Sequence, residues 1–482
     1  MEKEKSLNKN MIMSTILTIS NFIFPLITYS YVARIISPSG IGKVAFVNSV
    51  LSYFIYIATL GIPSYGLREC AKLRNDKEKL SKTFQELLII NLVSTMFAYI
   101  LLFIVIISVN KLHNYKILFL IMSSQIFLNS IGVEWLYQAL EEYSYITIRS
   151  VFFKVIGVLL TFILIKSPDD ILLYGFLTIF AASANYICNF INIHKYITFK
   201  KFKNYNLKKH FKPIFSLLTA SIIISIYANF DIVMLGFISS EYEVGLYNAA
   251  LKIKSILLSL STAITAVMIP RISYYIQKKD EKGINKLLIK SLQISLLIAF
   301  PVCIYCLVFS KNILLFVCGI SYIEAENTLK LLMILILPLI LTNLFGNQIL
   351  IPFGKENRFS QSVFIGMWIN LILNLLLIPK YGASGAAFGS IITEIWNVFW
   401  MSHNEKKYKK LFIKNIKFLN YLFSITVSSL GSIIVYMLCQ KYGIFIQLVL
   451  TSIVYFTTYY IILIILKEPI LYNTVQKLLK KN

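Results

Sequence analysis

Apolar stretches long enough to cross a lipid bilayer follow one another along almost the whole chain. A helix needs about 20 apolar residues to span the hydrocarbon core, where every backbone polar group must be paired within the structure. The stretches that meet this length are residues 11–35, 42–63, 86–108, 116–138, 146–165, 170–193, 213–238, 244–269, 287–309, 328–351, 360–378, 384–402, 418–438 and 445–466. The sequence therefore predicts an all-α integral membrane protein with 14 transmembrane helices. The stretch 311–322 is too short to span and is expected to form a surface or re-entrant helix.

Composition and charge agree with a membrane protein. Of the 482 residues, 57% are hydrophobic and only 14% are charged, which leaves too few polar groups to cover a soluble globule. A net charge of +25 would suggest nucleic-acid binding in a soluble protein. When the connections alternate sides, however, most of the 47 lysines and arginines fall on the side of the N-terminus, as the positive-inside rule requires. We therefore expect both termini in the cytoplasm and no nucleic-acid partner.

A short turn and its later echo predict the domain organisation. The turn SPSGIG at 37–42 is too short to hold a domain, so the two helices it joins are expected to be antiparallel neighbours. A related stretch, SSEYEVGLYNAA at 239–250, recurs about six spans after SPSGIGKVAFVN at 37–48. An even number of intervening spans makes the repeat parallel. We predict an N-lobe at 1–200 (helices 1–6), a C-lobe at 205–405 (helices 7–12), helices 13–14 at 418–466, and a cytoplasmic tail at 467–482.

Charged side chains inside the apolar stretches are the informative positions. Each costs about 2.5–3.5 kcal/mol to insert, so it is expected in the bundle interior or a wet cavity. The set is Arg34, Glu134, Lys154, Asp231, Lys252, Lys254, Lys330 and Glu394. Similar depths predict ion pairs between Asp231 and Lys252 and between Glu134 and Lys154, although such pairs could simply lock helices together. Arg34, Lys43, Lys254 and Lys330 could instead reach a membrane interface.

The buried set contains more cations than anions, which favours a site for an anion. Lysine and arginine bind phosphate oxygens through strong charge-assisted hydrogen bonds. Polar residues at helical spacing are typical of a wet face, and they comprise Asn48, Ser49 and Ser52 in one span, and Ser221, Ser225 and Asn229 in another. The same residues could instead tie helices together in lipid. Both interpretations stay open from the sequence alone.

Other motifs do not indicate catalytic chemistry. Cys303 and Cys306 form a Cys-x-x-Cys inside an apolar stretch without nearby ligands, so we interpret them as packing residues. The glycines in YGASGAAFGSI at 381–391 enter a helix without a preceding strand, which favours close helix packing over nucleotide binding. There is no P-loop. We therefore predict no catalytic residue, no metal site and no cofactor.

Three segments resemble a known family. They are PLITYSYVARIISPSGIGKVAFVNSVLSYFIYIATLGIPSYGLRECAK at 25–72, EWLYQALEEYSYITIRS at 134–150 and NFDIVMLGFISSEYEVGLYNAALKI at 229–253. Together they resemble the polysaccharide repeat-unit (O-antigen/capsule, Wzx-type) flippases of the MOP exporter superfamily. The resemblance runs from about residue 10 to 402, and the last two spans match in number and composition only.

The resemblance implies a transporter, not an enzyme. It implies two six-helix lobes that alternate access around a cationic cavity, with helices 13 and 14 beside a groove for a polyprenyl tail. The implied substrate is an undecaprenyl-pyrophosphate-linked oligosaccharide, moved from the inner to the outer leaflet of the bacterial cytoplasmic membrane for lipopolysaccharide or capsule. Membrane lipids and the polymerase and chain-length proteins of the same pathway are the implied partners.

Site residues follow from the resemblance by position. Contacts to the anionic headgroup are expected from Arg34, Arg149, Lys154, Lys252 and Lys254. Gating or ion coupling is expected from Glu134, Asp231 and Glu394, and the polar cavity lining from Asn48, Ser225 and Asn229. Lysines outnumber arginines in this set, so most contacts would be point charges without bidentate geometry.

Two related transporters and one enzyme class compete with this interpretation. A drug or ion antiporter of the same superfamily would need only 12 spans, so the last two spans count against it. A peptidoglycan-precursor flippase is a closer alternative that the sequence does not separate. A glycosyltransferase or polymerase would need catalytic carboxylates on a sizeable loop, and the longest outer connection, 310–327, has only Glu324 and Glu326.

Overall fold

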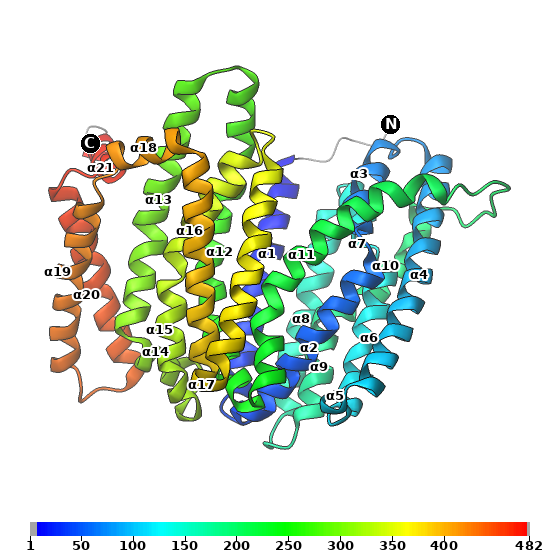
Figure 1. Cartoon of the computed structure of the whole chain (residues 1–482), viewed down its shortest axis with the longest axis horizontal. Coiled ribbons are helices and arrows are strands. Elements are labelled where there is room, and N and C mark those ends of the chain that lie inside the picture. The colour runs from blue at the N-terminus through cyan, green and yellow to red at the C-terminus, as the bar shows by residue number, and fades with distance from the viewer. Residues whose placement is uncertain (1–6, 480–482) are drawn as a thin grey trace. The chain divides into compact units, whose positions relative to one another are not determined.

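The computed structural model describes residues 7–479, although not the side chains of residues 7, 8, 219–227, 260, 261, 263, 478 and 479. Within that range the chain is helical and has no strand. It divides into two compact units, Met1–Gly245 and Leu246–Asn482, which are described separately. The helices of the first unit, drawn from blue to green in Figure 1, are α1 (Leu7–Val32), α2 (Pro38–Thr59), α3 (Ile62–Lys72), α4 (Lys77–Ser108), α5 (Asn110–His113), α6 (Lys116–Gly132), α7 (Glu134–Ala139), α8 (Tyr143–Leu164), α9 (Ile171–Ser183), α10 (Asn185–Asn192), the 3-10 helix Ile193–Lys195 and α11 (Lys208–Ile238).

The second unit continues the helical pattern. Helix α12 (Glu241–Gln277) begins just before the boundary between the units. It is followed by α13 (Glu281–Val308), α14 (Ser310–Val317), the 3-10 helix Ile320–Ala325, α15 (Glu326–Ile334), α16 (Ile336–Asn343), the π-helix Leu344–Leu350, α17 (Glu356–Asn404), α18 (Lys406–Asn415), α19 (Phe418–Leu438), α20 (Ile444–Ile465) and α21 (Pro469–Leu479). Helix α11, which the sequence assigns to the C-lobe, belongs to the first unit, where it packs on α2.

The described helices include 12 that are long and apolar enough to cross a membrane. The sequence predicts 14 spans, and the two counts differ at two places. The stretches 360–378 and 384–402 are counted together in α17, in which two helices meet at the non-helical Gly382 and pack on each other, with Ser362 Oγ donating to Asn397 Oδ1 at 2.9 Å. The stretch 213–238 lies in α11, of which only Ala228–Ile238 is counted, as a shorter apolar helix. The number 14 therefore stays a prediction, whereas the all-α multi-pass membrane fold is confirmed.

Helix α4 shows the polarity expected of a helix in lipid. Its polar residues Gln85, Glu86 and Asn91 are buried, whereas large apolar residues such as Met96 and Phe103 are exposed. This is the reverse of a water-soluble helix. It fits a bundle in which polar groups pair inside and apolar side chains contact lipid.

The two related stretches of the sequence meet within the first unit. A Cβ atom on Gly42 in α2 would lie 1.8 Å from the carbonyl oxygen of Glu241. A Cβ atom on Gly245 in α12 would lie 2.0 Å from the carbonyl oxygen of Pro38. Both glycines therefore permit a backbone approach that no other residue allows. At these two glycines the first turns of α2 and α12 are in direct backbone contact.

In the second unit, small residues join neighbouring helices. Ser424, Ser428 and Ser432 are buried at four-residue spacing along α19, which packs closely with α20. Such small side chains allow close approach of membrane helices. In α17 a Cβ on Gly385 would lie 2.6 Å from the Leu377 carbonyl oxygen, so this glycine serves close packing, as the sequence indicates.

Candidate functional site

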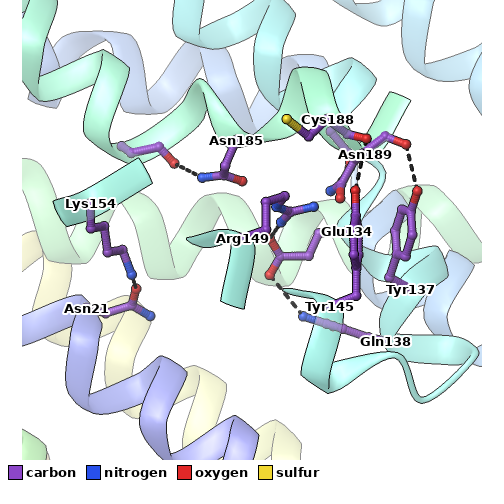
Figure 2. A network of polar contacts seen from close by, with 12 residues as sticks. Asn21, Glu134, Tyr137, Gln138, Tyr145, Arg149, Lys154, Asn185, Cys188 and Asn189 are labelled. Carbon is purple, nitrogen blue, oxygen red and sulfur yellow. Dashed lines mark hydrogen bonds and ion pairs between the residues drawn. The ribbon is translucent and has the colours of Figure 1, made fainter. Parts of the chain in front are cut away.

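A break between two helices places the first charged group of the candidate site. Helix α6 ends at Gly132, and Val133 adopts a left-handed conformation with φ of 37°. Helix α7 then begins at Glu134. This places the Glu134 carboxylate in the unit interior opposite Arg149, which lies on the buried side of α8 (Figure 2).

Arg149 has an unusual set of contacts. Its side chain is only 7% exposed. The Nη2 atom lies 3.5 Å from Glu134 Oε2, and the guanidinium lies over the Tyr145 ring, 5.3 Å from its centroid. Yet Nε, Nη1 and Nη2 have no hydrogen-bond partner among the described residues. A buried donor without an acceptor costs free energy, so the unfilled guanidinium is a candidate binding group for an anion.

Lys154, five residues further along α8, attaches that helix to α1. Its buried ammonium donates to Ser20 Oγ at 2.9 Å and to Asn21 Oδ1. Thr147 adds a third link, because its hydroxyl donates to the Met13 carbonyl oxygen at 2.9 Å. An ammonium has three donor hydrogens, so one remains for a further acceptor. Lys154 can therefore both hold α1 and contact a ligand.

We call Glu134, Tyr145, Arg149 and Lys154 the arginine cluster. The tyrosine is fixed, because its hydroxyl donates to the Cys188 carbonyl oxygen at 3.0 Å. The Glu134 side chain is 29% exposed, so the cluster can be reached at its carboxylate. With two cations and one anion, the cluster has an excess of positive charge in a region shielded from water. This arrangement can bind a phosphate or carboxylate group.

Comparison with known proteins gives the family. A profile described as "Polysaccharide biosynthesis protein" matches residues 7–276, more than half of the chain. The chain belongs to the polysaccharide biosynthesis protein family. A second profile, MatE, matches residues 217–376. Membership confirms the predicted resemblance to the flippases of the MOP superfamily.

Individual relatives of the protein match most of the chain. A protein from Escherichia coli (strain K12) named "Putative O-antigen transporter" is 25% identical over 81% of this chain and 94% of its own length. A protein of the same name from Shigella dysenteriae is 27% identical over 82% of this chain and 99% of its own length. A solved structure titled "Lipid II flippase MurJ, inward closed conformation" superposes with a TM-score of 0.72, with 16% identity, over 95% of this chain and 98% of that chain. These relatives are named as transporters, as the sequence predicts. The similarity to the solved structure shows the fold.

The structure corrects one of the two ion pairs predicted from the sequence. Glu134 is expected to pair with Lys154, but its ion pair is with Arg149. Lys154 instead donates to α1. The reason is geometric, because Arg149 is one helical turn closer to the start of α8 and faces the beginning of α7. The three residues still share one cluster.

The other predicted residues of the first unit lie outside the arginine cluster. Arg34 is exposed in the turn between α1 and α2, which favours the interface interpretation. Asn48 on α2 and Asn229 and Asp231 on α11 are half-buried. The side chain of Ser225 lies outside the described residues.

The remaining predicted residues lie in the second unit. Lys252 and Lys254 on α12 are half-buried. Asp231 and Lys252 fall in different units, so their ion pair stays a prediction. Glu394 is buried in α17 and accepts a hydrogen bond from Thr342 Oγ1 at 2.7 Å. Lys330 pairs with Glu326 at 2.7 Å near the surface, as expected of a side chain at an interface.

Sequence analysis misses a second buried cluster in the first unit. Glu86 on α4 is fully buried and accepts hydrogen bonds from the backbone of Asn206 at 2.8 Å, from Lys209 Nζ at 2.8 Å and from His210 Nε2 at 2.9 Å. The hydroxyl of Tyr65 on α3 contacts His210 Nδ1 at 2.9 Å. A signal was available, since Glu86 is an acidic residue at the first position of an apolar stretch that faces a basic connection.

Metal ligation receives no support from the described side chains, among which no group of three or more His, Cys, Asp or Glu residues is placed to hold an ion. Cys303 and Cys306 are buried in α13. We conclude that the arginine cluster offers a buried, charged binding group without a hydrogen-bond partner among the described residues.

Proposed function

We propose that this protein is a flippase that moves undecaprenyl-pyrophosphate-linked oligosaccharide repeat units from the inner to the outer leaflet of the bacterial cytoplasmic membrane. It would work by alternating access, with both termini in the cytoplasm, in the biosynthesis of lipopolysaccharide or capsule. Family membership and the names of the relatives support the substrate class. Polymerase and chain-length proteins of the same pathway would use its product.

The arginine cluster is the observation that carries the proposal. Arg149 holds three buried guanidinium nitrogens without hydrogen-bond partners among the described residues, and Lys154 is buried in the same helix. A guanidinium can donate two parallel hydrogen bonds to phosphate oxygens. In this proposal the pyrophosphate displaces Glu134 as the principal partner of Arg149. Glu134 offsets the charge of the empty site, and its release signals that the site is loaded.

A flipping assay with a matched control tests the site. Proteoliposomes would contain a fluorescent undecaprenyl-pyrophosphate oligosaccharide, and its appearance in the opposite leaflet would be measured. We expect Arg149→Gln to slow flipping by about 10- to 100-fold, the value of one or two hydrogen bonds to a charged group. Arg149→Lys should recover part of the rate, because lysine restores the positive charge but cannot donate two parallel hydrogen bonds as a guanidinium does.

Arg68 is the matched control for Arg149. It also lies over a tyrosine ring, at 5.7 Å from the centroid of Tyr65, and 3.5 Å from a carboxylate, that of Glu69. Its side chain, however, is 59% exposed. Arg68→Gln should leave flipping unchanged. Equal rates for wild type and a folded Arg149→Gln variant would refute the assigned site.

Membrane potential supplies a driving force in this proposal. Moving one charge through 100 mV is worth about 2.3 kcal/mol. A pyrophosphate with about two negative charges gains from outward movement when the cell interior is negative. If the cationic site neutralises it, the empty positive site gains on its return instead. We therefore expect flipping to survive ionophores that abolish sodium and proton gradients while the potential is kept. Unchanged flipping at zero potential would contradict this.

The MatE match at residues 217–376 favours a second candidate, a drug or ion antiporter. In that case the buried charges, Asp231 and Glu394 among them, would bind the exported cation. The same proteoliposomes distinguish the two functions. Failure to flip several lipid-linked oligosaccharides, together with export of a soluble cation, would select the antiporter. Flipping of a peptidoglycan precursor alone would select the related flippase.

A further inference from the structure

A small pocket lined by several polar and charged residues lies within the second unit. Its volume is about 80 Å³, and it lies among Gln293 of α13, Lys417 and Asn420 at the start of α19, and Lys467 and Glu468 at the end of α20. Figure 1 shows α18 and α21 at this same end of α19 and α20. Nothing in the proposed transport cycle uses this pocket.

Two lysines of the pocket flank apolar helices. Lys417 directly precedes the apolar helix α19, and Lys467 follows the apolar helix α20. Large apolar side chains next to them, Leu419 and Ile465, are exposed. A ligand of these lysines can therefore have a charged group in the pocket and apolar chains along the helices. This combination is the chemistry of a membrane lipid.

A buried amide inside the pocket lacks a partner. Gln293 is only 8% exposed, it lines the pocket, and its side chain has no hydrogen bond to another described residue. A buried amide needs a partner to offset its desolvation. A phosphate oxygen in the pocket would accept its N–H. Gln293 thus indicates a ligand with acceptor atoms, independently of the two lysines.

The backbone at Lys467 permits a substitution that removes only its side chain. Lys467 has a φ of 54°. Its N–H bonds to the Ile464 carbonyl, and that of Glu468 bonds to the Leu463 carbonyl, which is the helix ending where glycine is usual. A lysine in this left-handed conformation costs more than glycine, so Lys467→Gly is compatible with the fold.

Glu468 does not prevent anion binding. One of its carboxylate oxygens accepts from the Tyr421 hydroxyl at 3.0 Å and the other from the Leu471 backbone N–H at 2.8 Å. Both oxygens are therefore engaged in fixing the turn between α20 and α21. The local charge of the two lysines and this glutamate stays positive.

We propose that this pocket binds the phosphate of an anionic phospholipid headgroup. Lys417 and Lys467 would bind the phosphate, Gln293 would donate to it, and the acyl chains would lie along α19 and α20. The basic helix α18 beside it, with the sequence KKYKKLFIKN, would attract anionic lipid to the surface. This inference does not depend on which substrate the protein transports.

The test measures retained lipid on the intact protein by native mass spectrometry. Delipidated protein in detergent would be titrated with phosphatidylglycerol or with phosphatidylcholine of the same acyl chains. We expect a preference for phosphatidylglycerol, weakened about fivefold by Lys417→Gln and about fivefold by Lys467→Gly. Inorganic phosphate at millimolar concentration should not displace the lipid. Displacement by phosphate, or tighter binding of undecaprenyl phosphate than of phosphatidylglycerol, would overturn the assignment.

Lys279 provides a control for the backbone effect. It has a φ of 55° and ends α12 in the same way, but it does not line the pocket. Lys279→Gly and Lys467→Gly should both keep or raise the melting temperature, because glycine fits this conformation. Only Lys467→Gly should lose lipid. Equal loss in the two variants would show general attraction to a basic surface and refute a specific pocket.

Discussion

The first unit contains two buried charge clusters that are built in opposite ways. In the cluster of Tyr65, Glu86, Lys209 and His210, which we call the glutamate cluster, Glu86 has a donor for each oxygen. In the arginine cluster, Arg149 has a carboxylate at 3.5 Å and no hydrogen bond among the described residues. The first cluster is closed to further partners, whereas the second has donors to offer.

The difference separates a structural role from a binding role. The glutamate cluster holds the connection between the 3-10 helix Ile193–Lys195 and α11 against α4. Gln85 adds to it by donating to the carbonyl oxygens of Thr198 at 2.9 Å and Lys200 at 3.2 Å. A fully paired network makes a structure rigid. Unpaired buried donors, by contrast, are retained where a ligand completes them. Burial of a charge is thus a poor sign of function, and an incomplete set of partners is a better one.

Glu86→Gln should give the largest effect on stability. The amide cannot accept from all three donors, and its own N–H₂ would face another donor. We expect a loss of about 2–4 kcal/mol in the free energy of unfolding, measured in mixed micelles. Glu69→Gln on α3 is the control and should change little, because this half-buried carboxylate pairs with the exposed Arg68 and Lys72. A Glu86→Gln variant as stable as wild type would remove the contrast between the clusters.

Glu134→Gln is the matching change in the arginine cluster, with a smaller effect of a different kind. The 3.5 Å pair and the partly exposed carboxylate predict a stability change of less than about 1 kcal/mol. Because Glu134 competes with an anion for Arg149, binding of inorganic pyrophosphate, measured by calorimetry, should tighten about fivefold. Weaker binding would mean that Glu134 positions Arg149 instead of competing for it.

The membrane architecture could be predicted from the sequence because its cause is local. Each span needs only its own run of apolar residues, so α4, α19 and α20 fall close to the expected stretches. The break at Gly382 in α17 lies between the expected stretches 360–378 and 384–402. The number of spans stays a prediction, because only Ala228–Ile238 of the stretch 213–238 is counted, as a shorter apolar helix.

The partners of the charged residues could not be predicted as well. Arg149 and Lys154 share one helix, as the predicted span 146–165 implies. Their partners depend on where α7 begins, and the left-handed Val133 that determines this has no sequence signal. Glu86 was missed although it stands at the first position of an apolar stretch, because its donors come from residues more than a hundred positions away.

The pH dependence of the unfolding free energy tests whether His210 is held neutral in the glutamate cluster. Glu86 is an acceptor, so neutral His210 donates from Nε2 and accepts from Tyr65 at Nδ1. Burial, helped by Lys209 and opposed by Glu86, lowers the pKa of His210 below 6.5. The unfolded chain then binds the proton first, so stability should fall as the pH drops below about 6.5. His210→Asn should flatten this slope in unfolding measurements between pH 5 and 8, and a slope unchanged by the substitution would assign it to other groups.

The smallest effect is expected at a charged residue that belongs to neither cluster. Lys330 lies within a predicted span, yet its side chain is 40% exposed. Its partner, Glu326, lies one helical turn earlier on α15. Exposed pairs of this kind contribute about 0.5 kcal/mol or less. Lys330→Gln should therefore leave both unfolding free energy and flipping within experimental error of wild type. A large loss of flipping would show that a fully partnered surface lysine can also serve transport, and incomplete pairing would then no longer distinguish binding groups from structural ones.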